Sequence, residues 1–154
     1  MPNYWLMKSE PAEASIDDLV HAPQQTLPWT GVRNYQVRNF MRDAMQPGDG
    51  VLFYHSSCAC PGVAGLARIV GQAQPDATQF EPASPYFDPK ATREKPRWVQ
   101  IDVALQRKTR LLPLAEIRGA PELAEMAVLR RGNRLSITPV TPAQWLAVLA
   151  RLER

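Results

Sequence analysis

The chain has 154 residues, of which 45% are hydrophobic and 21% are charged. This composition excludes wholesale disorder and is typical of one globular domain with room for a core. Fifteen prolines argue against an all-helical bundle. The formal net charge of +3 is compatible with a phosphate-bearing partner, but it is far from the excess of Lys and Arg that alone would indicate nucleic-acid binding.

The two cysteines, Cys58 and Cys60, are separated by one residue. A structural disulfide across so short a gap would be strained, so we expect a reducing compartment. The N-terminal residues carry no basic segment followed by an apolar run, and no apolar stretch approaches the roughly 18 residues needed to cross a bilayer. The sequence therefore predicts a soluble cytoplasmic protein without a membrane segment.

The first half of the chain predicts two short helices and three strands. Residues 3–8 form the opening strand, and Ser15 with Asp18 forms the capping box of a short helix. After a proline-punctuated loop, Asn34 is expected to cap a second helix, which carries apolar residues at helical spacing up to Met45. Two further strands follow, at residues 51–55 and 61–71.

In the second half, residues 72–97 form an irregular segment that holds five of the fifteen prolines. A loop of this length inside a compact domain is usually functional. Residues 98–105 alternate as a half-buried strand, and residues 134–138 form the last strand. We expect helices at residues 114–118, at 121–131, and from Thr141 to the end, the last with Trp145, Leu146, Val148, Leu149 and Leu152 on its buried face. Together the elements predict a single α+β domain, residues 1–154, built on a mostly antiparallel curved sheet or small barrel.

Residues 55–60 place one histidine and two cysteines close together, which raises the question of a metal site. Structural zinc requires four ligands and wider cysteine spacing, and the other histidine, His21, lies in a separate loop. The sequence therefore predicts no metal and no cofactor.

The sequence also contains no recognisable set of catalytic residues. Ser56, Ser57 and Cys58 follow His55, but without the strand, G-x-S-x-G and helix context of a nucleophile elbow. The paired carboxylates lie in helical patterns typical of solvated faces, and no glycine-rich phosphate loop occurs. We expect no catalytic residues and hence a protein that is not an enzyme.

A binding pocket is better supported, because aromatic residues stand at the ends of elements and polar groups accompany them. The aromatic residues are Trp5, Trp29, Tyr54, Tyr86 and Trp98, and the polar groups are Lys8, Ser9, Arg33, Asn34, His55 and Ser56. Stacking on an aromatic face with a few hydrogen bonds to one edge is how proteins hold an unstacked nucleobase.

Simpler interpretations exist for several of these residues. A tryptophan in a strand is usually buried packing, which applies to Trp5 and Trp98. Asn34 suits a helix cap, and Arg38 with Arg42 suits a solvated helix face that could touch phosphates.

Several long blocks resemble the EVE domain family. The blocks are "YWLMKSEP" (4–11), "WTGVRNYQVRNFMRD" (29–43), "GDGVLFYHS" (48–56), "PGVAGLARIV" (61–70), "TQFEPASPYFDPKATREKPRWVQIDV" (78–103) and "RLSITPVTPAQW" (134–145). They cover nearly the whole chain in order. The resemblance implies a PUA-like fold, a small curved β-barrel with flanking helices, and a non-catalytic module that reads a modified base, with modified cytosine the favoured candidate, in DNA or RNA.

The resemblance also implies a ligand site. It comprises Lys8, Ser9, Trp29, Arg33, Asn34, Tyr54, His55, Ser56, Tyr86, Pro96 and Trp98. Independently of the resemblance, we expect Arg38 and Arg42 to contact phosphates, with Lys90, Arg93 and Lys95 as further cations. Trp29 would be a stacking wall, and the segment around Tyr86 a lid. In the family the turn that holds Cys58 and Cys60 is usually polar, which leaves the ligand open. A pocket for a nucleoside or another planar metabolite is the first alternative, and an enzyme acting on a nucleobase is the second.

Overall fold

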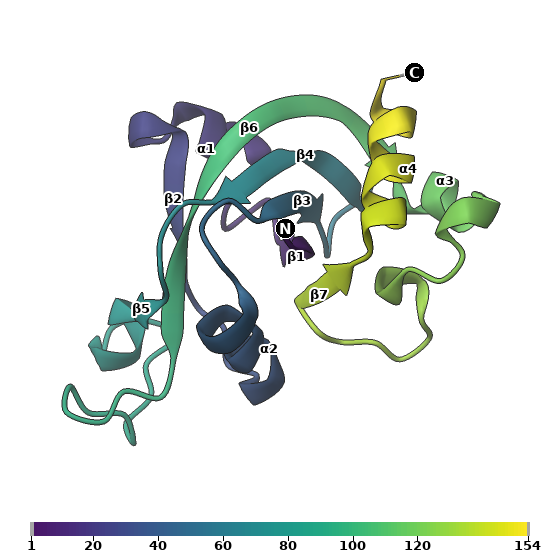
Figure 1. Ribbon diagram of the computed structural model, residues 1–154. Helices are drawn as coiled ribbons and strands as arrows, with labels where there is room; N and C mark the ends of the chain where they lie inside the picture. The colour runs from purple at the N-terminus through teal and green to yellow at the C-terminus, as the bar shows by residue number, and fades with distance from the viewer. Residues whose placement is uncertain (1, 154) are drawn as a thin grey trace.

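The computed structural model describes residues 2–153, and its centre is one large sheet flanked by short helices (Figure 1). In chain order the strands are β1 (Tyr4–Ser9), β2 (Thr26–Trp29), β3 (Gly50–His55), β4 (Gly62–Ile69), β5 (Gln74–Pro75), β6 (Val99–Pro113) and β7 (Ile137–Val140). The α-helices are α1 (Ile16–His21), α2 (Tyr35–Asn39), α3 (Leu114–Arg118) and α4 (Pro142–Leu152). A π-helical turn, Phe40–Ala44, continues α2, and short 3-10 helices lie at Pro23–Gln25, Ala77–Phe80, Pro121–Leu123 and Ala127–Leu129.

The strands follow the order β2-β6-β4-β3-β1-β7, and β5 pairs with β6 beside this path. All pairs are antiparallel except β1 with β3. The predicted α+β class is therefore confirmed. The sheet does not close into the expected barrel, because β2 and β7 stand at its two ends and are not paired with each other in the described part of the chain. Figure 1 shows the long strand β6 arching over the sheet instead.

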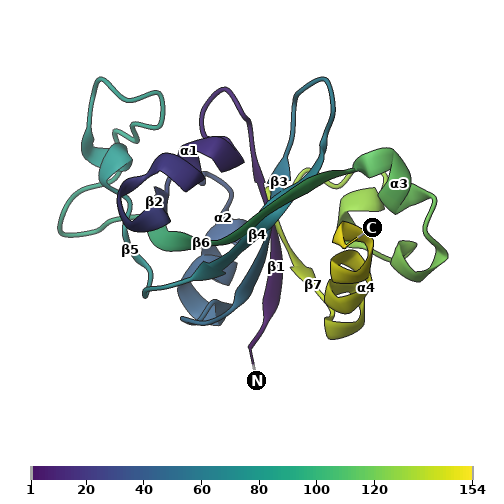
Figure 2. The same ribbon diagram turned by 90° about the horizontal axis from the view of Figure 1, so that it is seen from above.

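The sheet is buried on both faces. Trp5 and Met7 of β1 belong to one apolar cluster with residues of α1 and α2, whereas Leu6 belongs to a second cluster with residues of α3 and α4. Successive side chains of a strand point to opposite faces, so one strand serves both clusters. Figure 2 shows α1 and α2 on one side of the central strands and α3 and α4 on the other.

The predicted starts of α1, α2 and α4 are confirmed. Ser15 with Asp18, and Thr141 with Gln144, form complete capping boxes at α1 and α4. The side chain of Asn34 accepts a hydrogen bond from the Val37 N–H at 3.0 Å and caps α2.

Other predictions were wrong in detail. β2 occupies the expected loop and tolerates Pro28 because it is an edge strand. The helix expected at residues 121–131 is replaced by two 3-10 helices, the first of which buries Leu123, and Met126 is buried between them. Leu146, expected on the buried face of α4, is 64% exposed. None of the helices within residues 2–153 is long and apolar enough to cross a membrane.

Candidate functional site

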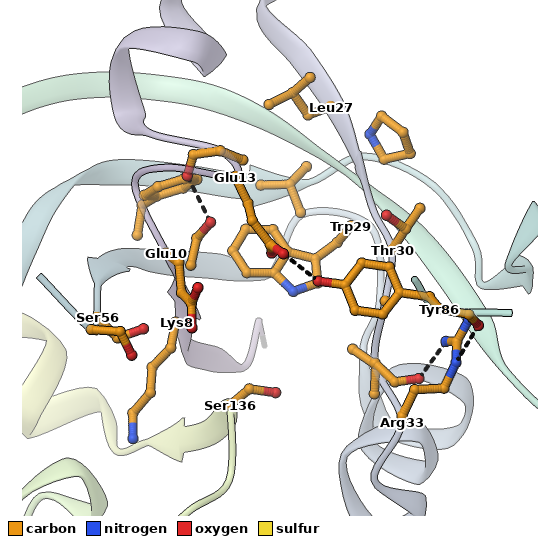
Figure 3. A pocket seen from close by; sticks show the side chains of 18 of the residues that line it. Lys8, Glu10, Glu13, Leu27, Trp29, Thr30, Arg33, Ser56, Tyr86 and Ser136 are labelled. Atoms are coloured by element: carbon orange, nitrogen blue, oxygen red, sulfur yellow. Dashed lines mark hydrogen bonds between the residues drawn. The ribbon is translucent and has the colours of Figure 1, made fainter. Parts of the chain in front are cut away.

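A pocket of about 750 Å³ opens where the loop between β1 and α1 (the β1–α1 loop), β2 and the residues that lead into β7 meet. Its volume lies in the range of small-molecule sites. The lining comprises residues 8–10, 13–14, 27–33, 56–57, Leu19, Phe53, Tyr86, Val103, Arg134 and Ser136. Figure 3 shows Leu27 at one side of the pocket and Lys8 with Ser136 at the opposite side.

Trp29 is a half-buried aromatic residue of the lining. It ends β2, where it pairs with Ile101 of β6, and its ring meets Phe53 edge to face at 5.6 Å and 78°. Within residues 2–153 its indole N–H makes no hydrogen bond. The indole therefore has a fixed position while its N–H remains available to a ligand.

Gly31, two residues after Trp29, occupies a position that favours glycine. Its φ is +82°, a conformation that favours glycine, and a Cβ at this position would lie 2.9 Å from ring carbons of Tyr86. The Tyr86 hydroxyl donates to Glu13 at 2.6 Å (Figure 3). This hydrogen bond is the main cause that raises the pKa of Tyr86 to about 12. Tyr86 is therefore a neutral side chain that lies against Gly31 and reaches the β1–α1 loop.

The segment around Tyr86 is joined to the residues that follow β2 by a buried ionic network. The fully buried Asp76 carboxylate accepts from the Gly31 N–H at 2.8 Å, the Thr78 N–H at 2.7 Å and the Arg33 guanidinium at 3.2 Å. Arg33 also donates to the Thr78 hydroxyl and to the carbonyls of Tyr86 and its own preceding residue. These bonds engage all five guanidinium N–H groups, so Arg33 fixes the pocket wall and has no donor left for a base.

On the opposite side of the pocket, fewer side chains have hydrogen-bond partners within residues 2–153. Lys8 lines the pocket, its ammonium group has no hydrogen-bond or ion-pair partner among the described residues, and partial burial lowers its pKa. Ser136 lies beside it, since the Lys8 N–H donates to the Ser136 carbonyl at 2.8 Å. Ser9, by contrast, donates its hydroxyl to the Ala14 carbonyl at 2.6 Å and shapes the β1–α1 loop.

Two carboxylates occupy the rim near Tyr86. Glu13 accepts from the Tyr86 hydroxyl, and Glu10 is close enough for its charge to contribute to the raised pKa of that hydroxyl. The Glu10 carboxylate has no partner among residues 2–153. The pocket therefore offers a free acceptor at Glu10 and a free donor at Lys8, two residues apart where β1 ends, and Figure 3 shows both on the same side of Trp29.

Tyr54 and His55 were expected to line the pocket, but neither residue does so. β3 alternates faces, so Phe53 lines the pocket while Tyr54, 2% exposed, lies in the cluster on the other face. His55 accepts from the Ile16 N–H at 3.0 Å and thereby holds the start of α1. Burial lowers the pKa of His55, which suits this acceptor role because only a neutral imidazole can accept.

Three further predicted residues also lie outside the lining. Asn34 caps α2, and Pro96 is exposed in the loop before β6. Trp98 is buried, donates to Asp88 at 2.8 Å and stacks on Tyr35 with ring centroids 4.7 Å apart. The predicted residues that the structure brings together at the pocket are Lys8, Ser9, Trp29, Arg33, Ser56 and Tyr86.

The cations predicted to contact phosphates are already engaged. Arg42 pairs with Asp43 at 2.9 Å, and Arg38 binds Asn39 and the Arg97 carbonyl. The Arg38 guanidinium also lies over the ring of Tyr35. Lys90, Arg93 and Lys95 do not line the pocket.

Several residues that line the pocket were not predicted from the sequence. Glu10 and Glu13 lie in the loop that follows Ser9, and their position soon after a predicted strand was the available signal. Arg134 and Ser136 reach the pocket because β7 pairs with β1, a contact between distant parts of the chain that no local pattern reveals. Among residues 2–153, no group of three or more His, Cys, Asp or Glu side chains is placed to hold a metal ion.

Comparison with known proteins identifies relatives of the whole chain. The model of the EVE domain family matches residues 3–151. Thymocyte nuclear protein 1 from Homo sapiens is 43% identical over 173 residues, covering 100% of this chain and 76% of the relative. A crystal structure of the human THYN1 protein in complex with 5-methylcytosine-containing DNA has a TM-score of 0.91 and 43% identity, covering 99% of this chain and 98% of that one. A hypothetical protein from Leishmania major has a TM-score of 0.94 and 47% identity, covering 99% and 96% of the two chains.

These relatives correct one expectation from the sequence. The prediction of a cytoplasmic protein was wrong, because the human and mouse relatives are named as nuclear proteins. The absence of a targeting pattern near the N-terminus was the basis of that prediction, and such an absence does not identify a compartment.

Proposed function

The chain belongs to the EVE domain family, and we propose that it binds DNA carrying a modified cytosine and holds the modified base in the pocket beside Trp29. The observation that supports this most directly is the half-buried Trp29 indole, which lines a pocket in a fold shared with a human protein solved in complex with 5-methylcytosine DNA. In this proposal residues 1–154 act as one domain.

Trp29 supplies the stacking surface in this proposal. Stacking of one base on an aromatic side chain contributes about 1–3 kcal/mol and depends little on sequence. Phe53 supports the indole from its edge, and Tyr86 borders the same pocket. A base turned out of the duplex would exchange stacking in the helix for stacking on Trp29.

Free polar groups at the pocket suit the edge of a cytosine. That edge donates through its N4 amine and accepts through other ring positions. Glu10 offers a free carboxylate as acceptor, and Lys8 offers a free ammonium as donor. Thymine carries a carbonyl where cytosine carries the amine, so an acceptor at Glu10 favours the cytosine.

The proposed role is non-catalytic. The relatives compared above carry no enzyme name. The imidazole of His55, the candidate base of the sequence pattern, accepts a structural hydrogen bond from the Ile16 N–H. A binding role uses stacking and hydrogen bonding alone.

The proposal is tested by measuring the dissociation constant for matched 12-base-pair duplexes with one 5-methylcytosine or one unmodified cytosine. We expect tighter binding of the modified duplex, and we expect Trp29→Ala to weaken that binding by about ten-fold or more, as loss of one base stack implies. Tyr35→Ala is the matched control, because Tyr35 is 50% exposed and lies outside the pocket.

Equal binding of both duplexes, or an unchanged preference in Trp29→Ala, would contradict the proposal. Binding of free 5-methylcytidine as tight as that of the duplex would instead identify a small-molecule site. A matched RNA probe in the same assay separates DNA from RNA as the partner.

A further inference from the structure

Residues 130–134 (RRGNR) carry three exposed arginines, Arg130, Arg131 and Arg134, and are called the arginine loop below. Their side chains have no carboxylate or hydrogen-bond partner within residues 2–153. Arg42, Arg107, Arg110 and Arg151 pair with Asp43, Glu153, Glu116 and Glu122, whereas Arg68 and Arg118 are exposed without such a partner among the described residues. Residues 130–134 differ from the sites of Arg68 and Arg118 because they hold three unpaired arginines within five positions.

The conformation of the arginine loop does not depend on these side chains. Asn133 donates through its side chain to the Ala127 carbonyl at 2.7 Å and accepts from the Leu135 N–H at 3.0 Å. The Asn133 N–H donates to the Arg130 carbonyl, and Gly132 turns the chain with φ +80°. Hydrogen bonds of Asn133 and the backbone of Gly132 thus shape the loop, which leaves the guanidinium groups available for binding.

The arginine loop adjoins the pocket. Arg134 is itself part of the lining, two residues before Ser136, and Lys8 lies beside Ser136 through the pairing of β1 with the residues that lead into β7. These cations occupy the side of the pocket that has no buried ionic network. The carboxylates of Glu10 and Glu13 belong to the β1–α1 loop.

We propose that the arginine loop binds the phosphates of the DNA strand that flank the base held beside Trp29. A base in a pocket leaves its own backbone phosphates at the pocket mouth, and guanidinium groups bind phosphate oxygens in bidentate geometry. Arg38 and Arg42 are less suited to this role, because both are engaged with neighbouring side chains and neither lines the pocket. This inference rests on the proposed function and adds the surface that would hold the DNA backbone.

The test is the salt dependence of binding to a 12-base-pair duplex that contains one 5-methylcytosine. Each phosphate contact contributes about 0.9 to the slope of log affinity against log salt for duplex DNA. Replacing Arg130, Arg131 and Arg134 together by Gln should lower the magnitude of the slope by about 2–3. The preference for the modified over the unmodified duplex should stay the same, since phosphates carry no base information.

Two matched variants isolate the effect. The triple Arg→Lys variant keeps the three charges and should retain most of the slope. The double variant Arg38→Gln, Arg42→Gln removes two cations that do not line the pocket and should leave the slope within about 0.5 of wild type. Thermal unfolding of each variant confirms that it is folded.

An unchanged slope in the triple Gln variant would overturn the inference, and so would a slope lost in the Arg38, Arg42 variant instead. A change in the preference for the modified base would also overturn it, because the loop would then be contacting the base. If the wild-type protein binds neither duplex at any salt concentration, the proposed function fails together with the inference. That result differs plainly from binding with an unchanged slope.

Discussion

The wall of the pocket built by Gly31, Arg33 and Tyr86 has its hydrogen-bonding groups joined to one another, through the buried Asp76 and through Glu13. The opposite side, built by Lys8 and the arginine loop, has cations without partners among the described residues. Both sides border the same cavity, yet one consists of satisfied groups and the other of available ones.

This difference separates two requirements of a binding site. A wall that positions an aromatic surface must be rigid, and a fully satisfied buried network provides rigidity. A side that contacts a charged ligand needs groups whose partners arrive with the ligand. The sequence places arginines on both sides, but the neighbours of each arginine determine which requirement it serves: Arg33 fixes the wall, whereas Arg134 has free donors.

The largest expected effect comes from breaking the network of the rigid wall. Asp76→Ala would leave the Arg33 guanidinium and the Gly31 N–H without their buried acceptor. We expect a loss of about 3 kcal/mol in the free energy of unfolding, measured by urea denaturation. Asp43→Ala is the control, because its pair with Arg42 is exposed and its loss should cost less than about 1 kcal/mol. Equal costs for the two variants would mean that the wall is not held by this network.

A smaller loss of stability is expected from Ala at Gly31 or Gly48, and comparing the two variants separates the effect of backbone strain from the effect of pocket shape on binding. Gly31 and Gly48 both have positive φ, +82° and +95°, so Ala at either position should cost about 1–2 kcal/mol of stability. Only at Gly31 would the added Cβ meet the Tyr86 ring, because nothing lies within 4 Å of a Cβ at Gly48. We therefore expect Gly31→Ala to weaken binding of the 5-methylcytosine duplex and Gly48→Ala to leave it unchanged. The dissociation constants of the two variants decide this point, and equal binding would remove Tyr86 from the site.

The smallest effect concerns how the β1–α1 loop is anchored. His55 accepts from Ile16 at the end of this loop, and burial lowers its pKa below the ordinary 6.5. The unfolded chain therefore binds a proton before the folded chain does, so this contribution to stability is complete above pH 6.5 and falls as the pH decreases from there. His55→Gln should flatten the dependence of unfolding free energy on pH in this window. A slope equal to that of wild type would show that another group titrates there.

The sequence predicted local structure best where a side chain acts on its own backbone. The capping boxes at Ser15 and Thr141 and the cap at Asn34 are of this kind, because each signal lies within three residues. Trp29, Tyr86 and Lys8 were also placed at the pocket in advance by the family resemblance, although their roles as ligand contacts stay predictions.

The rest could not be read from local patterns. Residues 51–54 of β3 are buried on both faces, so their apolar run carries no alternation to show that Phe53 and not Tyr54 faces the pocket. Whether the sheet closes depends on the distant ends β2 and β7, and the position of the arginine loop depends on pairing of β7 with β1. The engagement of Arg33 by Asp76, 43 residues away, is likewise a tertiary property.

The most direct measurement of the central claim is the fluorescence of 2-aminopurine placed next to a single 5-methylcytosine in a duplex. If the protein turns the modified base out of the stack and holds it beside Trp29, the fluorescence of the neighbouring 2-aminopurine should rise on binding. The rise should be absent with an unmodified cytosine and strongly reduced in Trp29→Ala. Saturated binding without any rise would show that the base stays stacked in the duplex, and it would contradict the assignment of this pocket as a base-binding site.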